Sequence, residues 1–294
     1  MISLGARRLF LFWTICVCSL LSSCSTIQLG YNQIDFLLKW RIDDFIDITT
    51  DQSQFYDQAF PIVIKKHRQE ELPKVLQKLR SIRSKLDQAL RVEDGVTIVK
   101  DVKSLAKDSI YLLIDDASTL ALMLQPKQIA YMENALSKSN KKFQADFLKG
   151  SPDERLEKRI EKVIERTESF AGDLSKSQKA SIKEIAKEHL LDMETVYQTR
   201  LYKQQLIIKT LKKIAQDQPS HAQTKIMITQ LFLEIEQGST PEQKEFEKNR
   251  DVQSGTILAK ITQLFDDQQR KKTQAKLRAW ENDVQSLIQH KSKS

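Results

Sequence analysis

A helix-start pattern recurs along this chain and constrains its fold more than any other feature. A small polar residue is followed three positions later by glutamine in ITTDQ (48–52), LSKSQ (174–178) and STPEQ (239–243), while LQPKQ (124–128) is a variant with proline at the first helical position. In such a capping box, the two side chains bond backbone N–H groups that a first helical turn leaves unpaired. The residues expected to act in this way are Thr49, Gln52, Gln128, Ser175, Gln178, Thr240 and Gln243. Because the starts are unevenly spaced, they indicate separately initiated helices rather than a strict solenoid repeat.

Apolar residues follow helical spacing between these starts, and the chain of 294 residues has only seven glycines and six prolines. The pattern predicts helices at 31–47 and at about 53–71, 74–91, 97–121, 127–148, 153–171, 176–216, 221–236 and 242–290. Breaks are expected at Pro73, at 93–95, at 150–152, at Gly172, Pro219 and Gly238, and near Gly255, with a kink or turn at Pro61. No Gly/Ser-rich linker divides the chain. Residues 31–294 are therefore predicted to form one all-α domain, an elongated bundle of antiparallel helical hairpins.

The first 24 residues have the layout of a secretory signal. Arg7 and Arg8 give a basic start, residues 9–21 are almost wholly apolar, and residues 22–24 are small. A spanning helix needs about 20 apolar residues, so this stretch is too short for a lasting membrane span.

The end of this segment, LSSC (21–24), resembles the bacterial lipobox. In that family the cysteine thiol receives a diacylglycerol and the signal is cut immediately before it, which would place the cleavage between Ser23 and Cys24. The resemblance implies that residues 1–23 are a cleaved lipoprotein signal peptide and that residues 24–30 are a lipidated tether. An ordinary signal with a chance cysteine is the alternative.

The remaining cysteines, Cys16 and Cys18, lie inside the signal, so no disulfide is expected in the mature chain. Ser25 follows the lipidated position, where an aspartate tends to retain such lipoproteins in the inner membrane. We therefore expect a protein of the bacterial envelope, anchored by lipid on Cys24 to the outer membrane and facing the periplasm.

Three blocks of sequence resemble an uncharacterised bacterial lipoprotein family, domain of unknown function 6279. The blocks are LGYNQIDFLLKWRIDDFIDITTDQ (29–52), HRQEELPKVLQKL (67–79) and ERTESFAGDLSKSQ (165–178). The positions that carry the likeness are Tyr31, Asn32, Asp35, Leu37, Leu38, Trp40, Asp43, Asp47, Thr49, Gln52, His67, Arg68, Glu71, Leu72, Pro73, Glu168, Phe170, Gly172, Leu174 and Gln178. Ser175 replaces the family's usual threonine. The resemblance implies an outer-membrane-type lipoprotein with no assigned activity.

The L-T-x-x-Q-like starts also resemble, more weakly, those of periplasmic helical proteins of the Spy and CpxP type, which form cradles from helical hairpins. Only the motif matches, and a capping box explains it by local physics alone.

Few residue patterns in the chain point to chemistry. His67 and Glu71 share a helix face and could serve a metal or acid–base role, but an ion pair or hydrogen bond is the favoured interpretation. The acidic cluster of Asp35, Asp43, Asp44 and Asp47 is interpreted mainly as polar helix faces and caps, and one of Asp115 and Asp116 is expected to pair with a basic residue. Tyr31 and Trp40 are expected to dock against the bundle, with a position near lipid as the alternative. There is no phosphate-binding glycine loop or nucleophile elbow, and we expect no metal and no cofactor.

The net charge is +8, and residues 270–294 contain seven basic and two acidic residues. A solvated helix end is the favoured interpretation of this segment, and contact with anionic headgroups is the alternative. Nucleic acid is not an expected partner, because basic residues elsewhere alternate with acids.

We expect a non-enzymatic, lipid-anchored interaction or chaperone-like scaffold, whose partners are the membrane and an envelope protein or an unfolded chain. The alternatives are an envelope enzyme acting on glycan or lipid, and a structural spacer between membrane and cell wall.

Overall fold

The computed structural model describes residues 26–289, and within this range the chain is all-α, as expected. Its helices are α2 (Thr26–Asn32), α3 (Ile34–Ile46), α4 (Thr50–Glu70), α5 (Leu72–Lys85), α6 (Val92–Tyr111), α7 (Ile114–Leu122), α8 (Pro126–Phe147), α9 (Pro152–Ala171), α10 (Lys176–His189), α11 (Met193–Asp217), α12 (His221–Gln237), α13 (Pro241–Gln263) and α14 (Asp267–Gln289). None of the described helices is long and apolar enough to cross a membrane.

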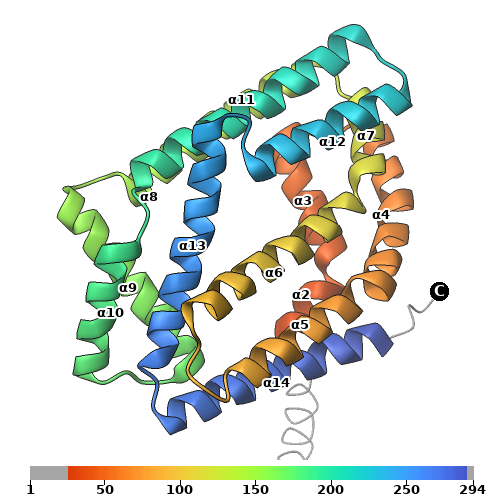
Figure 1. Ribbon diagram of the computed structural model, residues 1–294. Helices are drawn as coiled ribbons and strands as arrows, with labels where there is room; N and C mark the ends of the chain where they lie inside the picture. Colours follow the sequence, from red (N-terminus) through yellow and green to blue (C-terminus); the bar gives the residue numbers. More distant parts are fainter. Residues whose placement is uncertain (1–25, 290–294) are drawn as a thin grey trace, which may run out of the picture.

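Most of the helices form a frame, and others, including α6 and α13, lie inside its outline (Figure 1). Helix α14 lies beside α5 along one edge, α4 forms the next, and α11 and α12 lie along the edge opposite α14. The hairpin of α9 and α10 completes the frame, and α6 and α13 cross its interior in contact with each other.

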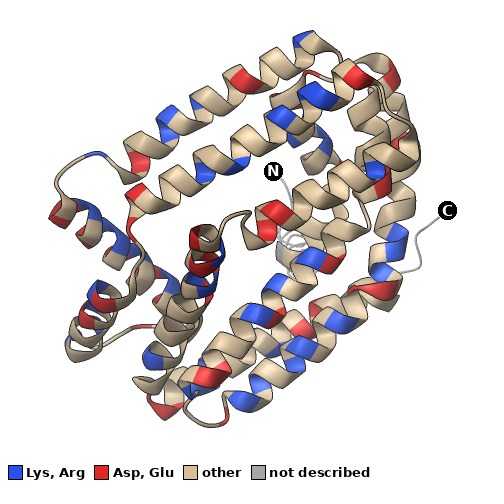
Figure 2. Ribbon diagram, turned by 45° about the horizontal axis from the view of Figure 1, so that its top comes forward, with Lys and Arg blue, Asp and Glu red and all other residues tan. Residues whose placement is uncertain are grey.

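The core formed by residues 26–289 contains four apolar clusters. The first is built by α7, α8, α11 and α12 around the fully buried Ile214. The other three lie along α5, α6, α9, α10, α13 and α14, with Ala259, Ile182 and Leu287 at their centres. Basic and acidic residues alternate over the outer faces (Figure 2), and several ion pairs, including Lys103–Asp251 at 2.8 Å, join neighbouring helices.

The predicted helices are present, but several predicted boundaries are wrong. The segment 97–121 is interrupted after Tyr111, and the segment 176–216 is interrupted at residues 190–192, where Asp192 caps α11 by accepting from the Thr195 N–H at 2.9 Å. The break expected at 93–95 lies earlier, because α6 begins at Val92 with the Asp94 carboxylate accepting from the Arg91 N–H.

Two further expectations about helix breakers are also wrong. Gly255 lies inside α13, and the break in that region comes at residues 264–266. Pro73 lies in the first turn of α5 rather than in a break. At Pro61, where a kink or a short turn was expected, the helix is not interrupted by a turn, because Pro61 lies inside α4, which continues to Glu70. Residues 26–30 of the expected tether are helical, since α2 begins at Thr26.

Candidate functional site

The capping boxes predicted from the sequence are present, and two of their glutamines meet in the interior. Thr49 and Gln52 form a reciprocal box at the start of α4, and Gln128 accepts from the Gln125 N–H at the start of α8. The two glutamine amides are both buried and exchange hydrogen bonds of 3.1 and 2.7 Å. Each amide nitrogen also donates to a carbonyl that lies two residues before the other helix cap, Met123 for Gln52 and Asp47 for Gln128.

The same arrangement occurs a second time, between the starts of α10 and α14. Gln178, in the predicted box with Ser175, exchanges hydrogen bonds of 2.7 and 3.1 Å with Gln269. Gln178 donates to the Leu264 carbonyl and Gln269 to the Asp173 carbonyl, again two residues before each cap. Sequence reasoning missed Gln269, although the spacing from Asp266 to Gln269 carries the same signal as the other boxes.

The predicted box of Thr240 and Gln243 is also present at the start of α13. Two further boxes that were not predicted begin α9, from Ser151 to Glu154, and α12, from Ser220 to Gln223. Their three-residue spacing to an acid or amide was the available signal.

Residues from two separate family-like blocks come together where α2 docks on α4. The Tyr31 hydroxyl lies 2.9 Å from His67 Nδ1, and His67 Nε2 lies 3.1 Å from the Ser109 hydroxyl of α6. Arg68 donates to the Asn32 side chain at 3.2 Å and stacks over the Tyr31 ring. Burial lowers the pKa of His67 below 6.5, although Glu71 partly opposes this shift. His67 therefore serves a hydrogen-bonded junction, which was the favoured interpretation.

Glu71 lies at the junction of α4 and α5 and is buried, with its carboxylate 2.9 Å from Lys74 Nζ. Lys74 also reaches Asp108 of α6 at 3.5 Å, so the three side chains join the α4–α5 corner to α6. Pro73, the neighbouring family-like position, lies in the first turn of α5, where its missing N–H is not needed.

The acidic residues in and directly after α3 have structural contacts or conformations. Asp43 accepts from the Ile48 N–H at 3.0 Å, Asp47 adopts a left-handed conformation (φ 56°) that ends the helix, and the Asp35 carbonyl accepts from the Tyr56 hydroxyl. Between residues 26 and 289, no group of three or more acidic, histidine or cysteine residues could hold a metal ion.

The predictions for Tyr31 and Trp40 have different outcomes. Tyr31 docks against the bundle as expected, but Trp40 is 59% exposed, so the expectation that it docks is wrong. Asp115, as predicted for one of the two neighbouring aspartates, pairs with Lys225 at 2.7 Å. Burial raises the pKa of Asp116, with a further contribution from Asp115.

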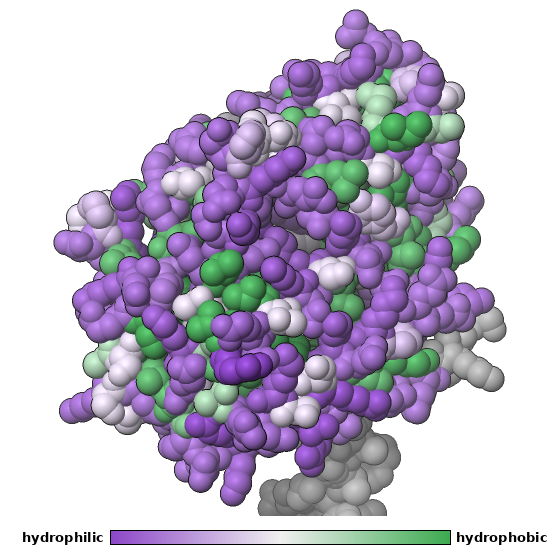
Figure 3. Space-filling model, in the orientation of Figure 1, coloured by the Kyte–Doolittle hydropathy of each residue, from purple (hydrophilic) through white to green (hydrophobic). Residues whose placement is uncertain are grey.

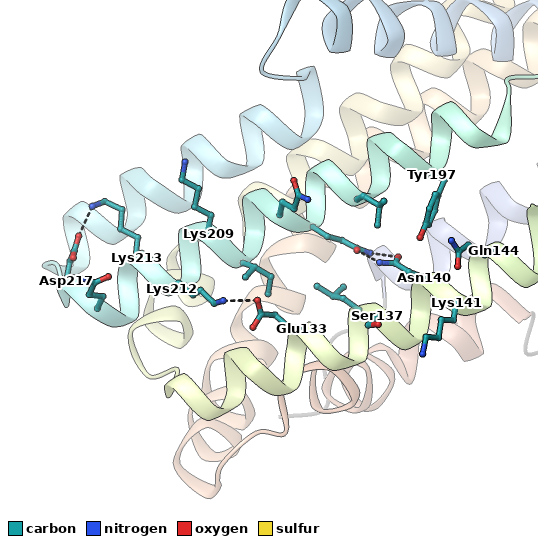
Figure 4. A pocket seen from close by; sticks show the side chains of 16 residues that line it. Glu133, Ser137, Asn140, Lys141, Gln144, Tyr197, Lys209, Lys212, Lys213 and Asp217 are labelled. Carbon is teal, nitrogen blue, oxygen red and sulfur yellow. Dashed lines mark hydrogen bonds and ion pairs between the residues drawn. The ribbon is translucent and has the colours of Figure 1, made fainter.

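An open groove with a volume of about 890 Å³ lies between α8 and α11 (Figure 4). Its floor is apolar and includes Leu136 of α8 and Leu201 and Ile208 of α11. The side-chain amides of Asn140 and Gln204 meet across it at 2.7 Å.

Basic residues dominate the rim of this groove. Lys212 of α11 crosses to Glu133 of α8 at 2.8 Å, and Lys213 pairs with Asp217 at the end of α11 (Figure 4). Lys141 and Lys209 also line the groove and are exposed, and no ion pair found in the described part of the chain involves them. Sequence reasoning missed this groove, for which the only signal was a set of apolar positions at helical spacing on two segments far apart in sequence.

Another, smaller hollow of about 480 Å³ lies between α3 and the start of α4. Phe36 and Trp40 form its apolar side, and Thr49, Thr50 and Ser53 form its polar side. The face of the molecule seen in Figure 3 is mostly hydrophilic, with hydrophobic residues in separate small groups. Three large exposed apolar side chains, Phe36, Leu37 and Trp40, lie on the 13-residue helix α3.

The predicted lipidation and cleavage positions, Cys24 and Ser23, lie outside the described residues.

Comparison with known proteins gives one result. The model of a family of unknown function, DUF6279, matches residues 44–237. No curated protein and no solved structure matches the chain.

Proposed function

The chain belongs to the DUF6279 family, and from this premise we propose that it is a non-enzymatic, lipid-anchored envelope protein that holds a helical segment of a partner protein between α8 and α11. The anchor is the lipid on Cys24, which places the protein on the periplasmic side of the outer membrane. The single observation that carries the proposal is the open groove of about 890 Å³ with an apolar floor.

The dimensions and chemistry of the groove support a helical occupant. It runs between helices of 22 and 25 residues, and its floor offers Leu136, Leu201 and Ile208 to the apolar side of an amphipathic helix. Lys141 and Lys209 on the rim favour acidic residues on the polar side of that helix. Lipid anchoring raises the local concentration of both proteins at the membrane, so a modest affinity is sufficient.

The polar residues considered for an enzyme favour a structural role instead. His67 is engaged by Tyr31 and Ser109, and Glu71 is engaged by Lys74. Asp43 and Asp47, from the acidic cluster, serve the end of α3. These contacts support the scaffold over the envelope enzyme.

Site-specific photocrosslinking in intact cells tests this proposal. A photoreactive residue at Gln205, which is exposed within the groove, is expected to give a covalent adduct of the lipidated protein with another envelope protein. The matched control is the same residue at Tyr131, which is exposed on α8 but does not line the groove. The Lys141→Glu, Lys209→Glu double variant changes only surface charges, and it should reduce the adduct without changing the melting temperature.

The form of the adduct separates two kinds of partner. A discrete band indicates one dedicated partner, whereas a broad smear indicates the unfolded chains that a chaperone would bind. Equal crosslinking from Gln205 and Tyr131, or none from either, contradicts the proposed groove.

A further inference from the structure

The N-terminal helices of the described chain carry an apolar stripe on their outer side. Leu29, Phe36 and Trp40 are 59%, 65% and 59% exposed, and Leu37 at the edge of the stripe is 45% exposed. Their spacings of seven and four residues place the first three on one side of a helix. The junction at Gln33 preserves this alignment, because the bonds from Gln33 N–H to the Leu29 carbonyl and from Leu37 N–H to the Gln33 carbonyl continue the helical pattern.

The opposite side of these helices is fixed to the bundle. Ile27 and Tyr31 pack against the cluster that contains Val284 and Leu287 of α14, and Gln28 donates to Asp283 at 3.0 Å. Ile46, at the other end, packs against the first core cluster. The exposed stripe therefore cannot turn inward without breaking these contacts.

The position of Cys24 defines what lies next to this stripe. Only Ser25 separates Cys24 from the first residue of α2, and two residues of chain span about 7 Å at most. A cysteine that carries acyl chains is held at the surface of the bilayer. Leu29, in the first turns of α2, must then lie close to the lipid headgroups, and the stripe extends about 16 Å further along the helices to Trp40.

We propose that α2 and α3 lie along the bilayer surface, with Leu29, Phe36 and Trp40 in the interfacial layer and Leu37 at its edge. The partner is the lipid surface itself, and the proposal rests on the anchor at Cys24. Tryptophan suits this position because its ring is apolar and its N–H can bond to headgroups or water.

The acidic residues beyond Trp40 set the limit of this contact. Asp43 and Asp44 are exposed one turn after Trp40. Arg41 pairs with Asp44 at 3.0 Å, whereas no ion pair in the described chain involves Asp43, so anionic headgroups would repel Asp43. The apolar contact therefore ends near Trp40, and the helix end that meets α8 through Asp47 is directed away from the membrane.

Tryptophan fluorescence of the lipidated, full-length mature protein in phosphatidylethanolamine–phosphatidylglycerol vesicles tests this inference. The Trp280→Phe variant leaves Trp40 as the reporter of the described chain. The reference sample is the same protein in detergent-free buffer after a protease has removed its lipidated N-terminus. Relative to this reference, the Trp40 emission of the vesicle-bound protein should shift to shorter wavelength. Lipids brominated on their acyl chains should quench it, and acrylamide should quench it less.

The matched control is Phe147→Trp in a Trp40→Phe, Trp280→Phe background, since Phe147 is 40% exposed at the distant end of α8. Brominated lipids should leave this reporter unquenched.

Flotation of the same vesicles separates failure of the anchor from failure of the inference, because protein that fails to float contradicts the lipid on Cys24. If the protein floats but brominated lipid does not quench Trp40, the inference is overturned. This also holds when the Trp40 emission is blue-shifted, because a blue shift without quenching indicates that protein rather than lipid covers Trp40.

Discussion

Each of the four paired glutamines uses its whole amide group. The oxygen of Gln52 accepts from the Thr49 N–H and from the Gln128 amide, while its nitrogen donates to Gln128 and to the Met123 carbonyl. A buried amide normally costs free energy unless its hydrogen-bonding groups are satisfied, and here its oxygen and nitrogen each have two partners. The pair therefore stabilises two helix starts and joins them to each other.

Replacing Gln52 with leucine should destabilise the protein by about 3 kcal/mol. The buried Gln128 amide loses one of the two partners of its oxygen and one of the two partners of its nitrogen, and the Met123 carbonyl loses the hydrogen bond from Gln52. The matched control is Gln243→Leu, which removes the same capping function from a half-buried position and should cost about 1 kcal/mol or less. Chemical denaturation measures both variants. Equal losses would show that pairing adds nothing to capping.

The His67 junction should make stability depend on pH. Burial lowers the pKa of His67 below its ordinary value of 6.5, so the unfolded state binds the proton more readily than the folded state. The stabilisation is complete above pH 6.5 and decreases as the pH falls below 6.5 towards the folded-state pKa. Acidification should therefore lower the melting temperature in this window.

The His67→Gln variant should show a smaller decrease in melting temperature over this window, because glutamine has no proton to gain. His221→Gln is the matched control, since His221 is exposed on α12, and its profile should follow that of the unmodified protein. Differential scanning fluorimetry across the range gives the comparison. Parallel profiles for all three proteins would rule out His67 as the titrating group.

At the scale of elements, the helix starts could be predicted because a capping box is contained in four consecutive residues. The pairing of Gln52 with Gln128 could not be predicted in this way, because the two residues are remote in sequence and only the folded chain brings them together. At Gly95 and Gly255, by contrast, the local sequence predicted a helix break that the folded chain does not have. Glycine favours breaks in isolated segments, but here each glycine allows α6 and α13 to approach backbone to backbone inside regular helices.

Replacing Gly255 with alanine should cost about 3 kcal/mol, because the new Cβ would overlap the backbone of Gly95 and Val96 and force α6 away from α13. Gly30→Ala is the matched control, as nothing lies within 4 Å of the added Cβ there and the helix gains about 0.5–1 kcal/mol. Denaturant titration with far-UV circular dichroism measures both. An unchanged midpoint for Gly255→Ala would show that this crossing relaxes freely.

At the scale of the whole molecule, the all-α class could be predicted from the helical periodicity of apolar residues and from the scarcity of glycine and proline. The groove between α8 and α11 could not be predicted from the sequence. Its floor combines Leu136 with Leu201 and Ile208, and their partial exposure depends on how far α8 and α11 separate. The four apolar clusters also depend on packing rather than on local pattern. The cluster of α7, α8, α11 and α12 meets α6 and α13 partly through ion pairs, including Lys107–Glu236 and Lys203–Glu247.

Because these contacts between the first cluster and α6 and α13 are partly ion pairs, the helices of the first cluster should unfold locally without unfolding the other helices. Ile214→Ala, in the first cluster, should therefore accelerate amide hydrogen exchange in α8, α11 and α12 while leaving α5 and α14 nearly unchanged. Leu287→Ala, in the fourth cluster, is the matched variant and should accelerate exchange mainly in α5 and α14. Each truncation removes a side chain that is at most 2% exposed and costs about 2–5 kcal/mol locally. Hydrogen exchange followed by mass spectrometry resolves the helices, and acceleration of all of them by both variants would establish one cooperative unit instead.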